Sequence, residues 1–395
     1  MQVQQHILVI LLPLGLVGCV EPFEPEIVNF ESVLVVEATI TDENKLQEVL
    51  LSRAFPLDTM GIYGESGAMV QITDSEGATF DFTHQGDGRY VSNASFAARN
   101  GIGYQLKIIT TDGKEYMSEE EIAPAPTQID SLYAERDFKD GDANEGIFIY
   151  VDSFDPSGES KYYRYEYEET YKIIAPYWAE KDFFMIEGQP LSPPEILPRT
   201  VINQTCYNTI SSIDIIQNST EELDQNKVTK FPVKFIDRGD FKITYRYSVL
   251  VRQFAQTQSA YQYYKTLEKL NGSESVFSQF QNGFLEGNLY SNQNVNEKVV
   301  GYFQVSSVSE KRLFFNYEDF FLGEARPKYA IQCPILNASP SLINGVYDLA
   351  WIDDYDPVAN PLNFWPEPNP WIAVPRPCSD CRALGSIVIP EFWVE

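Results

Sequence analysis

The chain has 395 residues and a formal net charge of −28. So acidic a surface repels nucleic acid and anionic lipid headgroups, and no nucleic-acid partner is expected. With 44% hydrophobic and 14% aromatic residues, the composition excludes a disordered chain and favours strands, and the length allows two or three domains.

The N-terminus carries the pattern of an export signal. An apolar run over residues 7–17 is shorter than the roughly 20 residues that a membrane-spanning helix needs, and it closes on small residues as a cleaved signal does. Cys19 follows directly. We therefore expect residues 1–18 to be a lipoprotein signal peptide and Cys19 to be the lipidation site that anchors the chain to a membrane. The alternative is an ordinary secreted protein, and the first six residues contain no Lys or Arg.

Residues 19–30 form an acidic, proline-containing tether, and the next 90 residues have the pattern of a β domain. Over residues 31–122, short alternating runs are separated by Asp-Gly and Glu-Gly turns. This spacing predicts an antiparallel, immunoglobulin- or transthyretin-like β-sandwich. The expected strands are residues 33–40, 48–53, 69–73, 79–83, 89–92, 103–110 and 114–118.

The alternating Ala and Pro of residues 123–126 predict a domain boundary. Beyond it, residues 127–336 are expected to form a larger fibronectin-III-like β domain. An irregular insertion is predicted at about 173–238, and one packed helix at about 257–271, with Thr257 at its cap. The expected strands are residues 128–135, 145–153, 161–172, 241–254, 299–305 and 311–317.

Within one of these strands, Tyr163, Tyr165 and Tyr167 share a face. The rings could stack on sugars, but core packing is the favoured interpretation. The last predicted part is a Pro/Trp-rich segment of residues 337–395 that packs on the second domain.

The cysteines predict a disulfide framework. Once Cys19 is lipidated, four remain in an oxidising compartment, which allows two disulfides and three connectivities. The disulfide candidates are Cys206, Cys333, Cys378 and Cys381. The spacing of the last two also fits half of a zinc site or a redox pair, but a zinc site normally needs a second such pair or two histidines. We therefore predict structural disulfides, no metal and no cofactor.

Hydrolase chemistry has little support in the sequence. His84 is the only histidine after the signal segment, whereas nucleophilic triads and zinc hydrolases need one or more placed imidazoles. Residues 140–146 resemble a calcium loop, but Glu145 stands where an EF-hand needs glycine. A turn between strands is the favoured interpretation, with a surface calcium site as the alternative. We do not expect an enzyme.

One acidic and aromatic cluster near the C-terminus is the candidate ligand site. Carboxylates beside aromatic platforms could bind a sugar or peptide, and a carboxylate pair alone suffices for glycoside hydrolysis. The alternative is that the segment packs against its own domain or a partner. The candidate residues are Trp351, Asp353, Asp354, Asp356, Trp365 and Trp371.

Several stretches together resemble the domain-of-unknown-function 4249 family, whose members are outer-membrane lipoproteins of Bacteroidota. The resemblance runs over nearly the whole chain after the signal. Its most telling stretches are residues 19–23, 34–37, 104–106, 206–207, 247–253, 260–264, 287–288, 301–303, 306–312, 378–381 and 390–393.

This resemblance implies a place and a neighbourhood rather than a reaction. The family's members are thought to work with TonB-dependent receptors of the Sus type, and acidic residues after the lipidated cysteine resemble a signal for the cell exterior. We expect a non-catalytic accessory subunit that captures substrate for a TonB-dependent outer-membrane receptor. The alternatives are a surface adhesin or structural lipoprotein that binds glycans or host polymers, and a carboxylate-based glycoside hydrolase.

Overall fold

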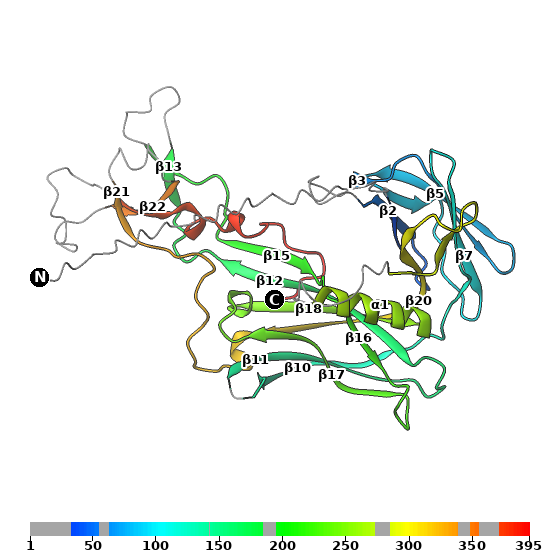
Figure 1. Cartoon of the computed structure of the whole chain (residues 1–395). Coiled ribbons are helices and arrows are strands. Elements are labelled where there is room, and N and C mark those ends of the chain that lie inside the picture. Colours follow the sequence, from blue (N-terminus) through cyan, green and yellow to red (C-terminus); the bar gives the residue numbers. More distant parts are fainter. Residues whose placement is uncertain are drawn as a thin grey trace, which may run out of the picture.

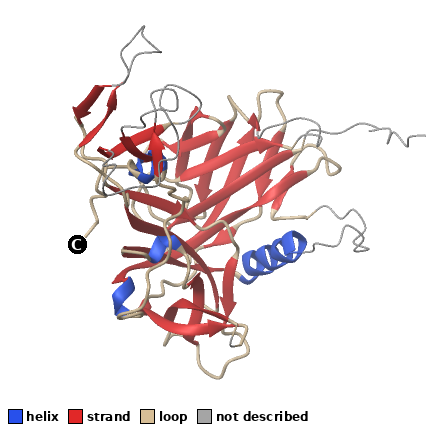
Figure 2. Cartoon of the chain, turned by 90° about the vertical axis from the view of Figure 1, so that its left-hand side faces the viewer, coloured by secondary structure: helices blue, strands red, loops and turns tan. Residues whose placement is uncertain are grey.

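The computed structural model describes residues 33–54, 63–141, 143–184, 195–272, 285–338, 348–354 and 371–395. Over these residues the fold is all-β, as predicted: strands dominate, and α1 (Gln258–Gly272) is the one α-helix among them (Figure 2). Within the described ranges, no helix combines the length and the apolar character that a membrane crossing needs. Residues 1–32, with Cys19 and the tether, lie outside them.

The first sandwich encloses one hydrophobic core that includes Val36, Tyr90 and Phe303. Its strands match the predicted runs closely because alternation fixes which side chains face inward. These strands are β1 (Leu34–Thr41), β2 (Glu48–Arg53), β3 (Tyr63–Gly64), β4 (Met69–Asp74), β5 (Thr79–Gly86), β6 (Arg89–Ser92), β7 (Gly103–Ile109), β8 (Glu115–Ser118) and β9 (Glu121–Ile122).

Two strands from much later in the chain complete this sandwich. They are β19 (Leu289–Ser291) and the first half of β20 (Val299–Asn316). β19 pairs with β8, and β20 pairs with β1 in parallel, with Val36 opposite Gly301. The expectation of a purely antiparallel sandwich is therefore wrong at β1, because a strand returning from a distant part of the chain can run in either direction.

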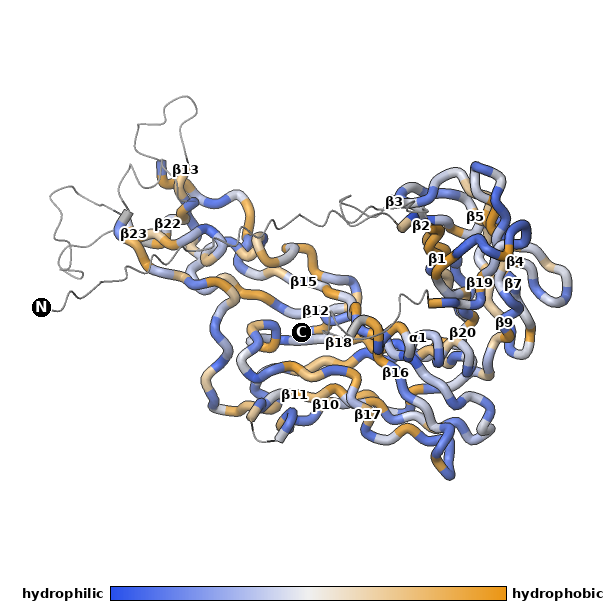
Figure 3. Tube along the Cα trace, viewed as in Figure 1, coloured by the Kyte–Doolittle hydropathy of each residue, from blue (hydrophilic) through white to orange (hydrophobic). Residues whose placement is uncertain are grey.

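The second sandwich packs two sheets across a core that includes Tyr163, Tyr165 and Cys206. In one sheet β18 lies between β12 and β20, and in the other β11 lies between β10 and β17. Both hydrophobic and hydrophilic residues occur along these strands (Figure 3). The strands are β10 (Ile129–Lys139), β11 (Asn144–Phe154), β12 (Tyr162–Ile174), β15 (Thr205–Ser211), β16 (Ile216–Ser219), β17 (Lys227–Asp237) and β18 (Arg246–Gln256).

The prediction of an irregular insertion at 173–238 is wrong for much of its length. β15 and β16 extend the sheet of β12, and β17 pairs with β11. Pro232 makes β17 hard to predict as a strand, because a proline in a sequence argues against a central strand. It is tolerated here because β17 lies at the edge of its sheet.

A third, smaller region lies at the far end of the second sandwich from the first (Figure 1). We call residues 181–184, 195–203, 336–338, 348–354 and 371–382 the apical unit. It consists of a hairpin, β13 (Lys181–Phe184) with β14 (Glu195–Pro198), and a small sheet of β21 (Leu336–Ala338), β23 (Trp371–Pro375) and β22 (Leu349–Asp354). Residues beyond it return to the second sandwich, where Trp393 packs on Tyr207 and Phe314.

Helix α1 lies where the two sandwiches meet. Thr257 caps it as predicted, its Oγ1 accepting from the Ala260 amide at 3.3 Å. The Glu121 carboxylate, 5% exposed, accepts from the hydroxyls of Thr257 (3.0 Å) and Tyr302 and from the Asn288 amide (3.2 Å). Burial raises the pKa of Glu121, and these hydrogen bonds only partly offset it.

The close approach of β1 and β20 at Gly301 predicts a large stability effect. Gly301 has φ of 122°, and a Cβ there would lie 1.9 Å from the Val36 carbonyl oxygen. Gly301→Ala should lower the free energy of unfolding by about 3 kcal/mol, measured by urea denaturation. Gly113→Ala is the control: its φ is 83° but its Cβ would meet nothing within 4 Å, so about 1 kcal/mol is expected. Equal losses would contradict the steric argument.

Glu121 predicts a pH-dependent contribution to stability. Because its pKa is raised in the folded chain, its stabilising contribution is present below the unfolded pKa and is lost as the pH rises through the folded value. Glu121→Gln keeps one carbonyl oxygen for Tyr302 and Asn288, and its amide can donate to Thr257. We expect the variant to be at least as stable as the parent at pH 8, with the difference shrinking on acidification, measured by urea midpoints at several pH values. A constant deficit at all pH values would contradict the prediction.

Candidate functional site

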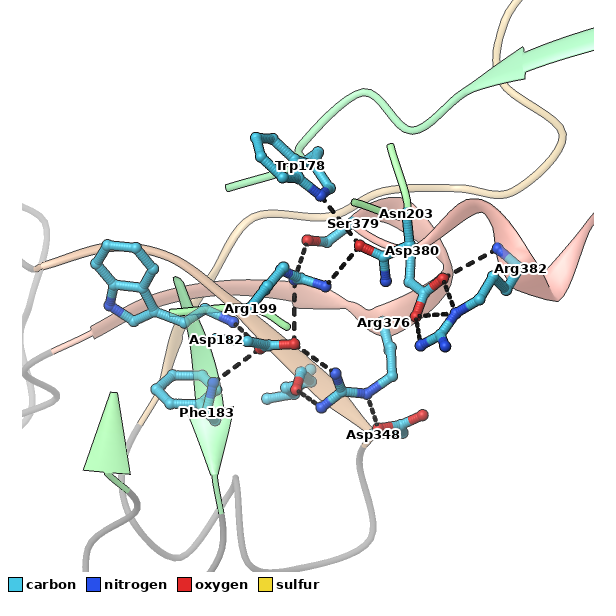
Figure 4. A network of polar contacts seen from close by, with 12 residues as sticks. Trp178, Asp182, Phe183, Arg199, Asn203, Asp348, Arg376, Ser379, Asp380 and Arg382 are labelled. Atoms are coloured by element: carbon cyan, nitrogen blue, oxygen red, sulfur yellow. Dashed lines mark hydrogen bonds and ion pairs between the residues drawn. The ribbon is translucent and has the colours of Figure 1, made fainter. Parts of the chain in front are cut away.

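The apical unit contains a polar cavity of about 190 Å³ between the β13–β14 hairpin and the segment after β23. Figure 4 shows the polar contacts that surround it. Three arginines and two aspartates contribute to its wall. The lining residues are Asp182, Phe183, Phe184, Arg199, Thr200, Val201, Asn203, Arg376, Asp380 and Arg382.

Asp182 is the centre of the network. The residue is 5% exposed. Its carboxylate accepts hydrogen bonds from Arg376 Nη1 at 2.7 Å and from Arg199 Nη2 at 3.1 Å. The backbone amides of Phe183 and Trp351 also donate to it, at 2.8 and 3.1 Å. Charge-assisted bonds to a buried carboxylate are the strong ones, so Asp182 ties the hairpin to the sheet and to the C-terminal segment.

Both disulfides fix the floor of the cavity. Cys206 is bonded to Cys381, and Cys333 is bonded to Cys378. The predicted disulfide framework is thus confirmed, and one of its three connectivities is established. Because the two cysteines of the Cys378-to-Cys381 spacing are bonded to distant partners, they form neither a redox pair with each other nor half of a zinc site.

Between these cysteines lie Ser379 and Asp380, both buried. Ser379 Oγ accepts from Arg199 Nη2 at 2.7 Å, and Asp380 accepts from Arg382 Nη2 at 2.6 Å. Burial works against the Asp380 charge, but the bonds from Arg382 outweigh it and lower the pKa of the carboxyl. The floor therefore presents a fixed, ionised network rather than titrating groups.

Arg199 is the least compensated charge of the site. Its side chain is 7% exposed, and two of its bonds go to neutral oxygens, those of Ser379 and Asn203. Burial lowers the pKa of Arg199, opposed by Asp182 and reinforced by the neighbouring arginines. Within the described residues its Nε has no hydrogen-bond partner. The wall of the cavity is thus electropositive at this point, on a chain that is strongly acidic.

Two of the predicted ligand residues, Trp351 and Trp371, lie in the apical unit but are not among the lining residues of this cavity. Trp371 packs edge-on against Phe183, with ring centroids 5.5 Å apart, and Trp351 lies under the Lys181 ammonium, 6.0 Å away. Asp353 and Asp354 belong to β22 and pair with Ile372 and Trp371. Asp356 and Trp365 lie outside the described residues.

Three further expectations concern residues elsewhere in the chain. Tyr163 and Tyr165 are fully buried, which confirms core packing. In the candidate calcium loop at the turn from β10 to β11, Asp142 lies outside the described residues, and Glu145 forms ion pairs with Arg136 and Arg238. In the described part of the chain, no three His, Cys, Asp or Glu side chains gather as a metal site would require.

The sequence reading missed the residues that form the cavity. Arg199 and Asp182 fall in the stretch predicted to be irregular, where no periodicity singles them out. A signal did exist at the other wall: Arg376 and Arg382 flank Cys378 and Cys381 within seven residues of an otherwise acidic chain. That spacing was interpreted through its cysteines alone.

Comparison with protein families gives one match. The model of the family described as "Domain of unknown function (DUF4249)" matches residues 20–312, more than half of the chain. The chain belongs to this family. The DUF4249 match includes Asp182 and Arg199 but ends before Arg376. The comparison with curated proteins found no match.

Asp182 and Asp348 allow a matched test of the network. Both bond to Arg376, but Asp182 is buried whereas the Asp348 side chain is 72% exposed. Asp182→Asn leaves two guanidiniums without a buried counter-charge, and a loss of about 3 kcal/mol is expected. Asp348→Asn should cost less than about 1 kcal/mol.

The measurement is hydrogen exchange of the backbone amides of β13 and β14, because this hairpin can open locally while the two sandwiches stay folded. Faster exchange confined to this hairpin in Asp182→Asn, with Asp348→Asn like the parent, is the expected result. Similar behaviour of the two variants would show that burial of the pair is not what holds the unit.

Proposed function

We propose that this DUF4249 protein is a surface-exposed, lipid-anchored outer-membrane protein that serves a TonB-dependent nutrient transporter as a non-catalytic accessory subunit. Its task is to capture or position substrate for that transporter. The family carries this proposal, because its resemblance implies partnership with such receptors.

The position of the family match supports the lipid anchor. The match begins at residue 20, directly after Cys19, which ends the apolar export pattern. The shared part of the family therefore starts where a lipidated mature chain would start. Two or three acyl chains on Cys19 would hold the protein firmly to a membrane.

The architecture supports capture rather than turnover. Two sandwiches joined through β20 provide a rigid scaffold, and loops and small units on such scaffolds make contacts with ligands. The apical unit offers the polar cavity, at the opposite end of the molecule from the first sandwich (Figure 1).

A pull-down from native outer membranes tests the proposal. The full chain, tagged after Glu395 through a flexible linker, is extracted in mild detergent and its companions are identified by mass spectrometry. We expect a TonB-dependent receptor in near-equal amount, and loss of both membrane association and receptor in Cys19→Ser.

The other outcomes point to the other functions. A lipidated chain that comes down alone contradicts the transport proposal and favours an adhesin. Turnover of a polysaccharide, abolished by a single Asp or Glu substitution, would make the chain a glycoside hydrolase.

A further inference from the structure

The charge on the wall of the apical cavity runs against that of the whole chain. The net charge is −28, yet three arginines and two aspartates line this space. Asp348, the remaining carboxylate of the network, is 72% exposed and bonds to Arg376 away from the lining. A concave site lined by excess charge of one sign concentrates ligands of the other sign.

The ion pairs do not use up the arginines. Asp182 is shared by Arg199 and Arg376, and Arg376 has a second partner in the exposed Asp348, so Arg199 has only a share of one carboxylate. Burial is the largest cause of the lowered pKa of Arg199, and the charges of Asp182 and Asp380 oppose it. Among the described residues, the Nε of Arg199 has no hydrogen-bond partner. Arg382 lies at the exposed side, with its side chain 53% accessible, and bonds to Asp380 through Nε and Nη2 only.

From this arrangement we propose that the apical cavity binds an oxyanion group, a carboxylate, sulfate or phosphate, carried by the ligand. Guanidinium forks match the planar or tetrahedral oxygens of such groups and hold them by charge-assisted bonds. The cavity of about 190 Å³ has room for one small acidic group, since a water molecule occupies about 30 Å³. That the group belongs to a captured nutrient rests on the proposed function; the binding itself does not.

The site is built before a ligand arrives. Cys378 and Cys381 are both disulfide-bonded and bracket the floor residues Ser379 and Asp380. Trp178 Nε1 and Arg199 Nη1 both donate to Asn203 Oδ1, at 3.0 and 3.3 Å. A donor set held in this way loses little freedom on binding, which favours affinity.

The test measures anion binding to the full chain in detergent. Thermal unfolding midpoints are recorded against increasing sodium sulfate, sodium phosphate or sodium glucuronate, with chloride keeping the ionic strength constant and glucose as the neutral counterpart of glucuronate. A ligand that binds the folded state raises the midpoint in a saturable way. We expect saturation with at least one oxyanion and none with glucose.

Arg382→Gln is the decisive variant because the Arg382 side chain is 53% exposed and glutamine keeps an amide donor for the buried Asp380 carboxylate. Loss of one charge-assisted contact should weaken binding about tenfold. Arg89→Gln is the matched control: Arg89 is 47% exposed and paired with Glu48 in the first sandwich, and its loss removes the same charge. It should leave the affinity unchanged.

The outcomes separate clearly. Tighter binding of glucuronate assigns a carboxylate ligand, and tighter binding of sulfate or phosphate assigns a sulfated or phosphorylated one. Absence of saturation with all three anions, or equal affinity in Arg382→Gln, overturns the inference.

Failure of the proposed function would look different. Arg382→Gln should still co-purify the receptor, so a chain that binds anions but no receptor loses the transport role and keeps the site. A chain that binds the receptor but no anion loses the site alone.

Discussion

The structure depends on one long strand that belongs to both sandwiches. β20 runs from Val299 to Asn316. Its first half pairs with β1 in parallel, and its second half pairs with β18 antiparallel. A shared strand makes the ladder of backbone hydrogen bonds continuous between the two cores, so the sandwiches cannot swing apart without breaking it. The two sandwiches are therefore held to each other by a shared strand rather than by a flexible linker.

The same strand explains why glycine and a buried amide occur beside it. Gly287 and Gly301 approach so closely that a Cβ on Gly287 would lie 1.7 Å from the Gly301 carbonyl oxygen. The Asn288 side chain takes the place of a neighbouring strand there. Its amide nitrogen donates to the Phe303 carbonyl at 2.8 Å, and its amide oxygen accepts from the Phe303 backbone N–H at 2.9 Å. A side-chain amide thus satisfies the edge of β20 where the sheet has no further strand.

Local patterns predicted local structure well and distant pairing poorly. β2 and β6 have the predicted bounds, and Thr257 caps α1, because alternation, turns and caps are encoded within a few residues. The parallel partner of β1 lies more than 250 residues away in the sequence, and neither segment has a sequence feature that indicates which strand it pairs with. β20 was read as two strands since Ser306, Ser307 and Ser309 interrupt the apolar run; all three are buried where the two sandwiches meet.

The candidate site shows the same limit. The cysteines could be recognised and their pairing could not, because four cysteines of similar surroundings carry no label of their partner. The tryptophans predicted to bind ligand were recognised by composition, which gave no sign that Trp371 packs on Phe183. The residues that line the cavity come from segments almost 200 positions apart, and only the folded chain brings Arg199 and Arg376 onto one carboxylate.

The described residues of the apical unit form a small core. Among them, its two hydrophobic clusters contain three buried residues each, and small units often depend on disulfides for stability. The disulfides close loops of 175 and 45 residues, which in the chain-entropy description stabilise by about 5 and about 4 kcal/mol. The disulfides fix the floor of the cavity, and the ion pairs of Asp182 add the connection to the β13–β14 hairpin.

This matters for what the network does. Burying ions costs solvation that their attraction barely repays, and well-packed apolar side chains of the same volume would stabilise the unit at least as well. Stability therefore gives no reason to place three guanidiniums around one cavity. Binding does give one, because a guanidinium already desolvated and oriented by Asp182 and Ser379 meets an incoming oxyanion without rearrangement. The free energy of folding offsets the cost of desolvating these charges. The ligand therefore meets donors that are already desolvated and oriented.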